Sequence, residues 1–246
     1  MSPTSVLIKI SKWLYNYLPD RHSHIFDYVY RGVTDGNRNR IRLMVFGDSN
    51  AYRPGNNRYC WPAILQRLGG VQIKVDNESY TGRTTQFDLG SLNGLQSIQE
   101  KIHRCDRLDY ILIALGTNDL KNRYGPPDAI DIVAGIDKII TTINCYNNVT
   151  KPVVLTPPPI GCVTSGELAG AQKRVSLLVD EYHRYARSHH VPIIDLFTKI
   201  DHNIDLELDR IHLNQVGRKK TAKIVWKHLS SILTKQGHPQ PIQFTP

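Results

Sequence analysis

The chain has 246 residues, a formal net charge of +9, and 40% hydrophobic and 22% charged residues. These values are ordinary for a globular protein of one domain, and they exclude a chain that is disordered throughout. No run approaches the roughly 18 apolar residues of a membrane-spanning helix, so an integral helical membrane protein is also excluded. The four cysteines form no CxxC pair, and the sequence predicts no metal site.

Residues 1–40 differ from the rest of the chain and predict a helical N-terminal extension. Its apolar residues recur at helical spacing: Val6, Leu7, Ile10, Trp13, Leu14 and Leu18. We expect this helix to pack on the body of the protein or to form a contact in a homo-oligomer. The alternative is a helix that touches a membrane surface, because Lys and Trp residues flank its apolar face. Lys9 and Lys12 interrupt the apolar run, so no signal peptide is predicted and a cytoplasmic location is expected.

The excess of positive charge does not by itself indicate a nucleic-acid partner. Basic residues are spread along the whole chain, and they do not alternate with aromatic residues as they do on surfaces that stack bases. The densest basic group lies in a C-terminal segment of helical periodicity: Arg218, Lys219, Lys220, Lys223 and Lys227. We interpret this group as the solvated face of a helix and expect no nucleic acid as a partner.

From residue 41 onward, short apolar runs alternate with stretches of helical periodicity. The apolar runs suit strands buried on both faces, and they lie at 43–46, 71–75, 110–115, 153–155 and 191–196. The helical stretches lie at 61–68, 92–102, 130–143, 168–186 and 222–233. This alternation predicts right-handed parallel crossovers, and hence a three-layer α/β/α sandwich around a five-stranded parallel sheet. We place this domain at 41–235 and a flexible tail at 236–246.

Polar residues follow three of the predicted strands, at the sheet edge where ligands of such folds bind. The first strand leads into GDSN, where Ser49 can stand on a tight turn with its hydroxyl exposed and its backbone N–H free for an oxyanion. After the second strand, Gly82 allows the backbone to approach a ligand closely. After the third strand, Asn118 offers an amide donor.

A carboxylate and an imidazole lie beyond the fifth predicted strand. Asp209 and His212 are three residues apart and can meet within one turn, where the carboxylate would hold the histidine tautomer that accepts a proton from a serine. With the residues above, they supply a nucleophile, a base, an orienting acid and donors for an oxyanion. Together these groups are the parts that acyl transfer requires.

These blocks resemble those of the SGNH, or GDSL-type, hydrolase superfamily. They stand here as GDSN, YTGRTT, GTND and DRIH, and Ser49, Gly82, Asn118 and His212 match the four named positions of the superfamily. The fuller pattern, which adds RYCWP, LNG and TPPP, is most similar to the arylesterase and acyltransferase-like branch. Asn50 departs from the leucine that usually follows the serine. The resemblance implies the flavodoxin-like fold of SGNH hydrolases.

The resemblance also implies a serine ester hydrolase that needs no metal or organic cofactor. Ser49 would attack the ester carbonyl, and His212 would take its proton and pass it to the leaving alcohol. Asp209 would orient His212 and stabilise its charged form. The backbone N–H groups of Ser49 and Gly82 and the side-chain amide of Asn118 would form the oxyanion hole.

The expected substrate is a small-molecule ester with a small or short acyl group, for example an O-acetylated carbohydrate. Asp48 and Arg83 are the candidate substrate-binding residues. Two alternatives stay open: an acyltransferase or membrane-associated lipase, and a non-catalytic binding module that retains the fold. The second is less favoured because every catalytic position is occupied.

Overall fold

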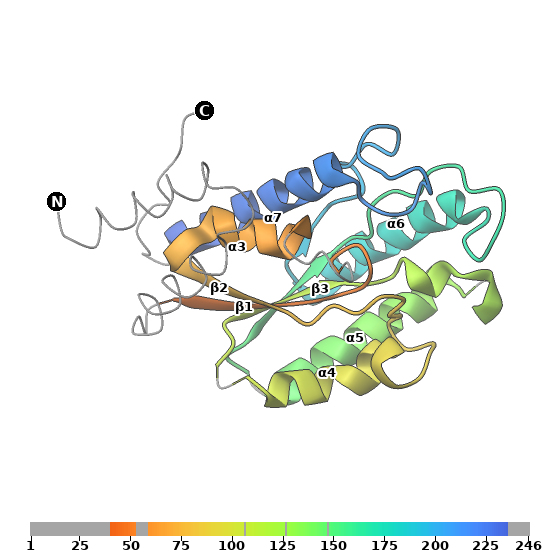
Figure 1. Cartoon of the computed structure of the whole chain (residues 1–246). Helices are drawn as coiled ribbons and strands as arrows, with labels where there is room; N and C mark the ends of the chain where they lie inside the picture. Colours follow the sequence, from red (N-terminus) through yellow and green to blue (C-terminus); the bar gives the residue numbers. More distant parts are fainter. Residues whose placement is uncertain (1–39, 53–58, 106, 126, 147, 236–246) are drawn as a thin grey trace. The chain divides into compact units, whose positions relative to one another are not determined.

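The computed structural model describes residues 40–52, 59–105, 107–125, 127–146 and 148–235 (Figure 1). The described residues from Ile41 onward belong to one compact unit. The predicted N-terminal extension, apart from Arg40, and the predicted tail at 236–246 lie outside the described residues, and both stay predictions. Within the described ranges, no helix is both long enough and apolar enough to cross a membrane.

Five parallel strands form one sheet in the order β2-β1-β3-β4-β5. They are β1 (Ile41–Gly47), β2 (Ile73–Asn77), β3 (Tyr110–Ala114), β4 (Lys151–Leu155) and β5 (Ile193–Ile194). From β1 the chain adds β2 on one side and then β3 on the other, so the strand order reverses between β1 and β3. Open parallel sheets bind ligands at the carboxyl ends of the strands beside such a reversal. The residues after β1 and β3 therefore occupy the position of a binding site.

Helices cover both faces of the sheet and make it the middle of three layers (Figure 1). One outer layer contains α4 (Gly94–His103), α5 (Ala129–Tyr146) and α6 (Ala171–His189). The other contains α3 (Trp61–Gly69) and α7 (Gln215–Lys235). This arrangement is the predicted α/β/α sandwich, and the prediction is confirmed.

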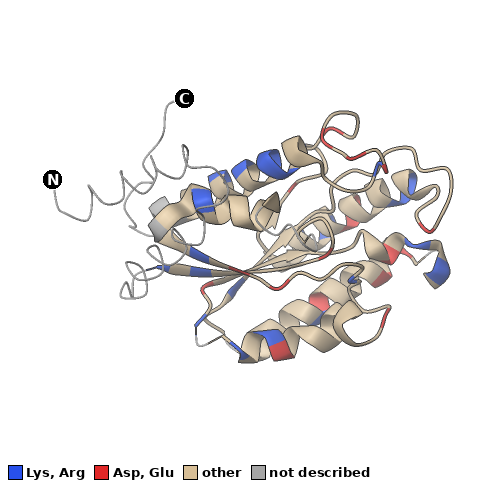
Figure 2. Ribbon diagram, viewed as in Figure 1, with Lys and Arg blue, Asp and Glu red and all other residues tan. Residues whose placement is uncertain are grey.

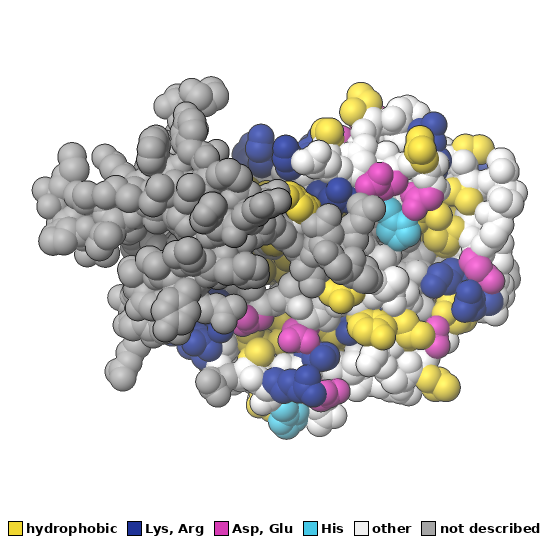
Figure 3. Space-filling view, viewed as in Figure 1, with side chains coloured by type: hydrophobic (Ala, Val, Ile, Leu, Met, Phe, Trp, Pro, Cys, Tyr) yellow, Lys and Arg dark blue, Asp and Glu magenta, His cyan; other side chains and the backbone are white. Residues whose placement is uncertain are grey.

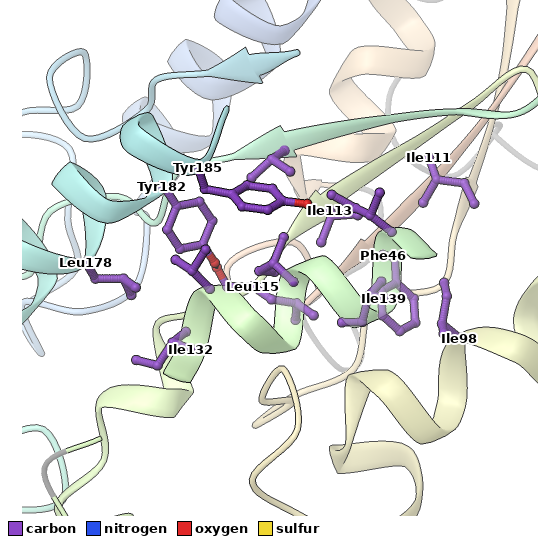
Figure 4. Close-up of a cluster of buried hydrophobic side chains, with 14 of the residues drawn as sticks. Phe46, Ile98, Ile111, Ile113, Leu115, Ile132, Ile139, Leu178, Tyr182 and Tyr185 are labelled. Carbon is purple, nitrogen blue, oxygen red and sulfur yellow. The ribbon is translucent and has the colours of Figure 1, made fainter. Parts of the chain in front are cut away.

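Side chains alternate between the two faces of a strand, so one apolar run can serve both helix layers. In β1, Leu43 and Val45 pack toward α3 and α7, whereas Met44 and Phe46 pack toward α4, α5 and α6. All four side chains are buried. Figure 4 shows the cluster on the side of α4, α5 and α6. In it, Phe46 lies among isoleucines of β3, α4 and α5, and Tyr182 joins the cluster from α6. The continuous apolar pattern of β1 follows from this double burial.

The last strand is shorter than predicted. The sequence predicts a strand at 191–196, but β5 contains only Ile193 and Ile194. The backbone N–H groups of Leu196 and Phe197 donate instead to the hydroxyl of Thr156, at 2.8 and 3.1 Å. This side-chain acceptor competes with the sheet ladder and ends the strand early.

The predicted basic group lies on α7, where Figure 2 shows a row of Lys and Arg residues. Three of its members are exposed, as the solvated face of a helix requires: Lys219, Lys223 and Lys227. The other two pair with acids of the preceding loop. Lys220 Nζ lies 2.7 Å from Asp205 Oδ2, and Arg218 Nη1 lies 3.2 Å from Glu207 Oε1. These ion pairs anchor the loop that carries the predicted acid and base of the site.

Candidate active site

The candidate nucleophile stands on a tight turn at the carboxyl end of β1. The carbonyl of Asp48 accepts the N–H groups of Ala51 and Tyr52, both at 3.0 Å, which closes the turn around Ser49. Gly47 permits this turn, because a Cβ atom there would stand only 3.0 Å from the Cβ of Ala51. Ser49 itself is half-buried, with its hydroxyl accessible to a partner from another loop.

The structure brings the three predicted triad residues into one chain of contacts. Ser49 Oγ lies 2.9 Å from His212 Nε2, although the two residues are 163 positions apart. His212 Nδ1 lies 2.6 Å from Asp209 Oδ2. An N–H at Nδ1 that donates to Asp209 leaves Nε2 as an acceptor for the serine hydroxyl, which is the tautomer that a general base requires.

Asp209 is held in place as an ionised acceptor. Its Oδ1 accepts the backbone N–H groups of Ile211 and His212, at 2.9 and 3.0 Å. Partial burial acts to raise the pKa of Asp209, but the hydrogen bonds from the backbone and ring of His212 and from Ile211 outweigh it and lower the pKa below its ordinary value. Arg210 takes a left-handed conformation, with φ of +62°, so that the turn between the acid and the base can close.

Two contacts that the sequence did not predict connect the base loop to its surroundings. The side chain of Asn50, the residue that departs from the family pattern, accepts the backbone N–H of Leu213 at 3.0 Å. It thereby joins the nucleophile turn to the residue after the base. On the other side, the N–H of Gly161 donates to the carbonyl of Arg210 at 2.8 Å. A side chain on Gly161 would not fit, because its Cβ would lie 2.9 Å from the Cβ of Arg210.

The three predicted oxyanion donors come from the ends of β1, β2 and β3. Gly82 has φ of +83°, a conformation that favours glycine. Among the described residues, no acceptor takes the backbone N–H of Ser49 or of Gly82. Asn118 begins the short 3-10 helix η5 (Asn118–Leu120), and its side-chain amide lies 3.3 Å from Asp48 Oδ2 and 3.2 Å from the carbonyl of Arg83. These two contacts are long for hydrogen bonds and fix where the amide lies.

The two predicted substrate-binding residues are buried in the structure. Arg83 is 1% exposed, and its guanidinium donates to the carbonyls of Glu78 and Ser91, at 2.7 and 3.0 Å. The same group lies 4.2 Å from the ring centroid of Phe46. Asp48 is 2% exposed and accepts the N–H of Asn50 at 2.9 Å. Both side chains contact the loops around the nucleophile, and their contact with substrate stays a prediction.

Two carboxyl groups are buried beneath the site. Burial raises the pKa of Asp48 to about 6, against the hydrogen bond from Asn50 and the nearby positive charges. Burial also raises the pKa of Asp119 to about 7, although Thr85 donates to its Oδ1 through both the backbone N–H, at 2.8 Å, and the hydroxyl, at 2.5 Å. The Oδ2 atom of Asp119 has no hydrogen-bond partner among the described residues. The charged form of Asp119 is therefore costly to bury.

We expect Asp119→Asn to stabilise the fold at alkaline pH. The variant keeps an oxygen acceptor for Thr85 and removes the buried charge. The folded-state pKa of Asp119, about 7, lies above the ordinary value of 3.8. The stability that the Asp119 carboxyl contributes to the wild type is therefore fully present below pH 4 and is lost as the pH rises through 7. At about 1.4 kcal/mol for each pKa unit, the free energy of unfolding of Asp119→Asn should exceed that of the wild type by at most about 4 kcal/mol at pH 8. Near pH 4 the excess should vanish.

Urea unfolding between pH 4 and pH 8 measures this difference. Asp180→Asn, at an exposed position of α6, serves as the matched control. A difference between Asp119→Asn and the wild type that stays constant across this range would contradict the prediction.

The arrangement defines a class of protein. A serine on a tight turn after the first strand of a parallel sheet, with a histidine and an aspartate from a later loop, is the site of an α/β serine hydrolase. The model of the GDSL-like lipase/acylhydrolase family matches residues 45–220, and the chain belongs to this family. The predicted SGNH/GDSL-type relationship is thus confirmed, and with it the class of carboxylic ester hydrolases. No curated protein sequence matches the chain.

Several solved structures have the same fold. A carbohydrate acetylesterase from Sinorhizobium meliloti has a TM-score of 0.71 and 20% sequence identity, and the match covers 78% of this chain and 100% of that one. An aryl esterase from M. smegmatis has a TM-score of 0.69 and 22% identity, with 78% and 100% covered. A lipolytic protein of the G-D-S-L family from Veillonella parvula has a TM-score of 0.62 and 16% identity, with 76% and 97% covered. At these identities the likeness concerns the fold.

Proposed function

We propose that the protein hydrolyses small acyl esters through an acyl-enzyme on Ser49. The observation that carries the proposal is the chain of contacts from Ser49 Oγ through both ring nitrogens of His212 to Asp209, at 2.9 and 2.6 Å. Each group in it stands at the distance and in the order that proton transfer from the serine requires.

The mechanism follows from this geometry. His212 Nε2 removes the proton of the Ser49 hydroxyl as the oxygen attacks the ester carbonyl, and the charged ring is stabilised by the carboxylate of Asp209. The oxyanion binds to the backbone N–H groups of Ser49 and Gly82, and the amide of Asn118 turns one N–H toward it. The protonated His212 then gives its proton to the leaving alcohol. Water, activated by the same ring, attacks the acyl-enzyme and releases the acid.

A short acyl group and a carbohydrate alcohol are the substrate features that we propose. The side chains of His212 and Asp209 are 42% and 46% exposed, so the described part of the site is open to a bulky alcohol. Two structural relatives support the proposal, since one is named a carbohydrate acetylesterase and another an aryl esterase. On the described part of the face in Figure 3, hydrophobic side chains lie in small separate groups. This distribution favours a small dispersed ester over a lipid surface as substrate.

The test is hydrolysis of p-nitrophenyl esters from acetate to palmitate, together with release of acetate from an acetylated sugar. We expect kcat/KM to be highest for acetate and to fall with chain length. A fluorophosphonate should inactivate the protein, and mass spectrometry should find its adduct on Ser49. Highest activity on palmitate, with liposome binding, would favour the lipase alternative, and faster transfer to an added alcohol than to water would favour an acyltransferase. No hydrolysis and no adduct would leave the binding module as the better reading.

A further inference from the structure

A lysine lies over the oxyanion loop. Lys121 follows η5 directly, three residues after Asn118, and a 3-10 helix has three residues per turn, so the two residues lie on the same side. The Nζ atom of Lys121 lies 3.9 Å from the point where a Cβ on Gly82 would stand. The ammonium group is thus placed beside Gly82, one of the three predicted oxyanion donors.

The ammonium of Lys121 has no partner among the residues that the structure describes. It is half-buried, and no hydrogen bond or ion pair connects it to any residue that the structure describes. The acids nearby are engaged elsewhere. Asp88 accepts the hydroxyl of Tyr124 at 2.6 Å, and Glu167 Oε2 lies 3.2 Å from Arg123 Nε. A cation that is partly removed from water and lacks a counter-ion is suited to an anion supplied from outside.

The electrostatic surroundings agree with this placement. Partial burial is the largest influence that lowers the pKa of Lys121, and the positive charge of Arg123 adds to it. The carboxylates of Asp48, Asp88 and Glu167 act in the opposite direction. The charged form of Lys121 would gain from a closer anion than these three.

We propose that Lys121 binds an anionic group of the substrate, so that the site takes esters that carry a carboxylate close to the ester carbonyl. The carboxylate belongs either to the acyl group or to the alcohol, as in the ester of an acidic sugar. This inference rests on the proposed esterase function. The recognition is a charge-assisted hydrogen bond from Nζ, made while the carbonyl oxygen lies in the oxyanion hole.

The test compares three esters that all release a coloured nitrophenolate. They are p-nitrophenyl acetate, the mono-p-nitrophenyl ester of succinic acid, and the acetate of a carboxylated p-nitrophenol. The measured quantity is kcat/KM for each anionic ester divided by kcat/KM for the neutral one. We expect Lys121→Met, which retains an apolar stem of similar length, to lower this ratio about 10- to 100-fold for at least one anionic ester. The ester that responds tells whether the anion belongs to the acyl group or to the alcohol.

Lys223→Met is the matched control, because it removes an exposed cation of α7, away from Lys121, and changes the net charge equally. It should leave the ratio as it is in the wild type. If Lys121→Met lowers kcat for neutral and anionic esters alike, the residue acts on the oxyanion itself and the proposal is overturned. The same holds if neither variant changes the ratio. Failure of the proposed function looks different, since none of the three esters would then be hydrolysed in a reaction that a Ser49-directed fluorophosphonate inhibits.

Discussion

Replacing Ser49 with alanine is expected to lower kcat for p-nitrophenyl acetate on the order of 10⁴- to 10⁶-fold. The substitution removes the oxygen that lies 2.9 Å from His212 Nε2 but keeps the backbone N–H that we propose as an oxyanion donor. Residual activity should come from the remaining oxyanion donors and from binding of the ester. Steady-state kinetics of the purified variant provides the measurement, with Ser165→Ala, in the exposed loop after β4, as a control that should retain full kcat.

The double variant Ser49→Ala with His212→Ala gives a sharper version of the same test. Residues that act as one unit are not additive, so the double variant should lose no more than a few-fold beyond Ser49→Ala alone. A base without its nucleophile has little left to contribute. If the loss of kcat in the double variant equalled the product of the losses in the two single variants, Ser49 and His212 would act independently. That result would contradict the prediction. Thermal unfolding of each variant separates lost chemistry from lost fold.

Much of the fold was predictable because parallel strands between two helix layers are apolar on both faces. The residues at 43–46 show this best, since all four are buried and alternate between the two cores. The prediction was less exact where a side chain competes with the ladder. The hydroxyl of Thr156 accepts two backbone N–H groups beyond Ile194. The local sequence at 191–196 does not indicate this acceptor, because it lies 40 residues away in the chain.

The proximity of the predicted catalytic residues was within reach of the sequence for two reasons. Asp209 and His212 are so close in the chain that a single turn brings them together. Ser49 and His212 are far apart, but both follow strands of one parallel sheet, whose carboxyl ends share an edge. The roles of these residues as nucleophile, base and orienting acid stay predictions. The contacts among them are necessary for these roles.

The environment of Arg83 was not predictable from its residue type. Charged side chains are seldom fully buried, which made a place in an open pocket a reasonable expectation. The burial is explained by backbone carbonyls of three segments, at Gly47, Glu78 and Ser91, that converge on one guanidinium. Such convergence depends on the tertiary fold. For the same reason the position of Lys121 over Gly82 became visible only in three dimensions.

The second large effect that we expect concerns Asn118. Replacing Asn118 with alanine should lower kcat about 100- to 1000-fold and change KM much less, because an oxyanion donor acts mainly in the transition state. In the free protein its amide is shared between Asp48 Oδ2 and the carbonyl of Arg83, at 3.3 and 3.2 Å. An oxyanion is a stronger acceptor than that carbonyl, so the amide can exchange one long contact for a short one.

Asp48→Asn separates the role of the Asn118 amide as a donor from the role of the carboxylate that holds this amide in place. The variant removes the carboxylate that accepts from the Asn118 amide, so kcat should fall by a smaller factor, about 10-fold, as expected for losing one charge-assisted hydrogen bond. Asn148→Ala, at an exposed turn, is the control for a lost amide. If Asn118→Ala reduced the unfolding temperature but left kcat intact, the amide would serve only to join the loops after β1 and β2. The oxyanion would then depend on the two backbone N–H groups alone.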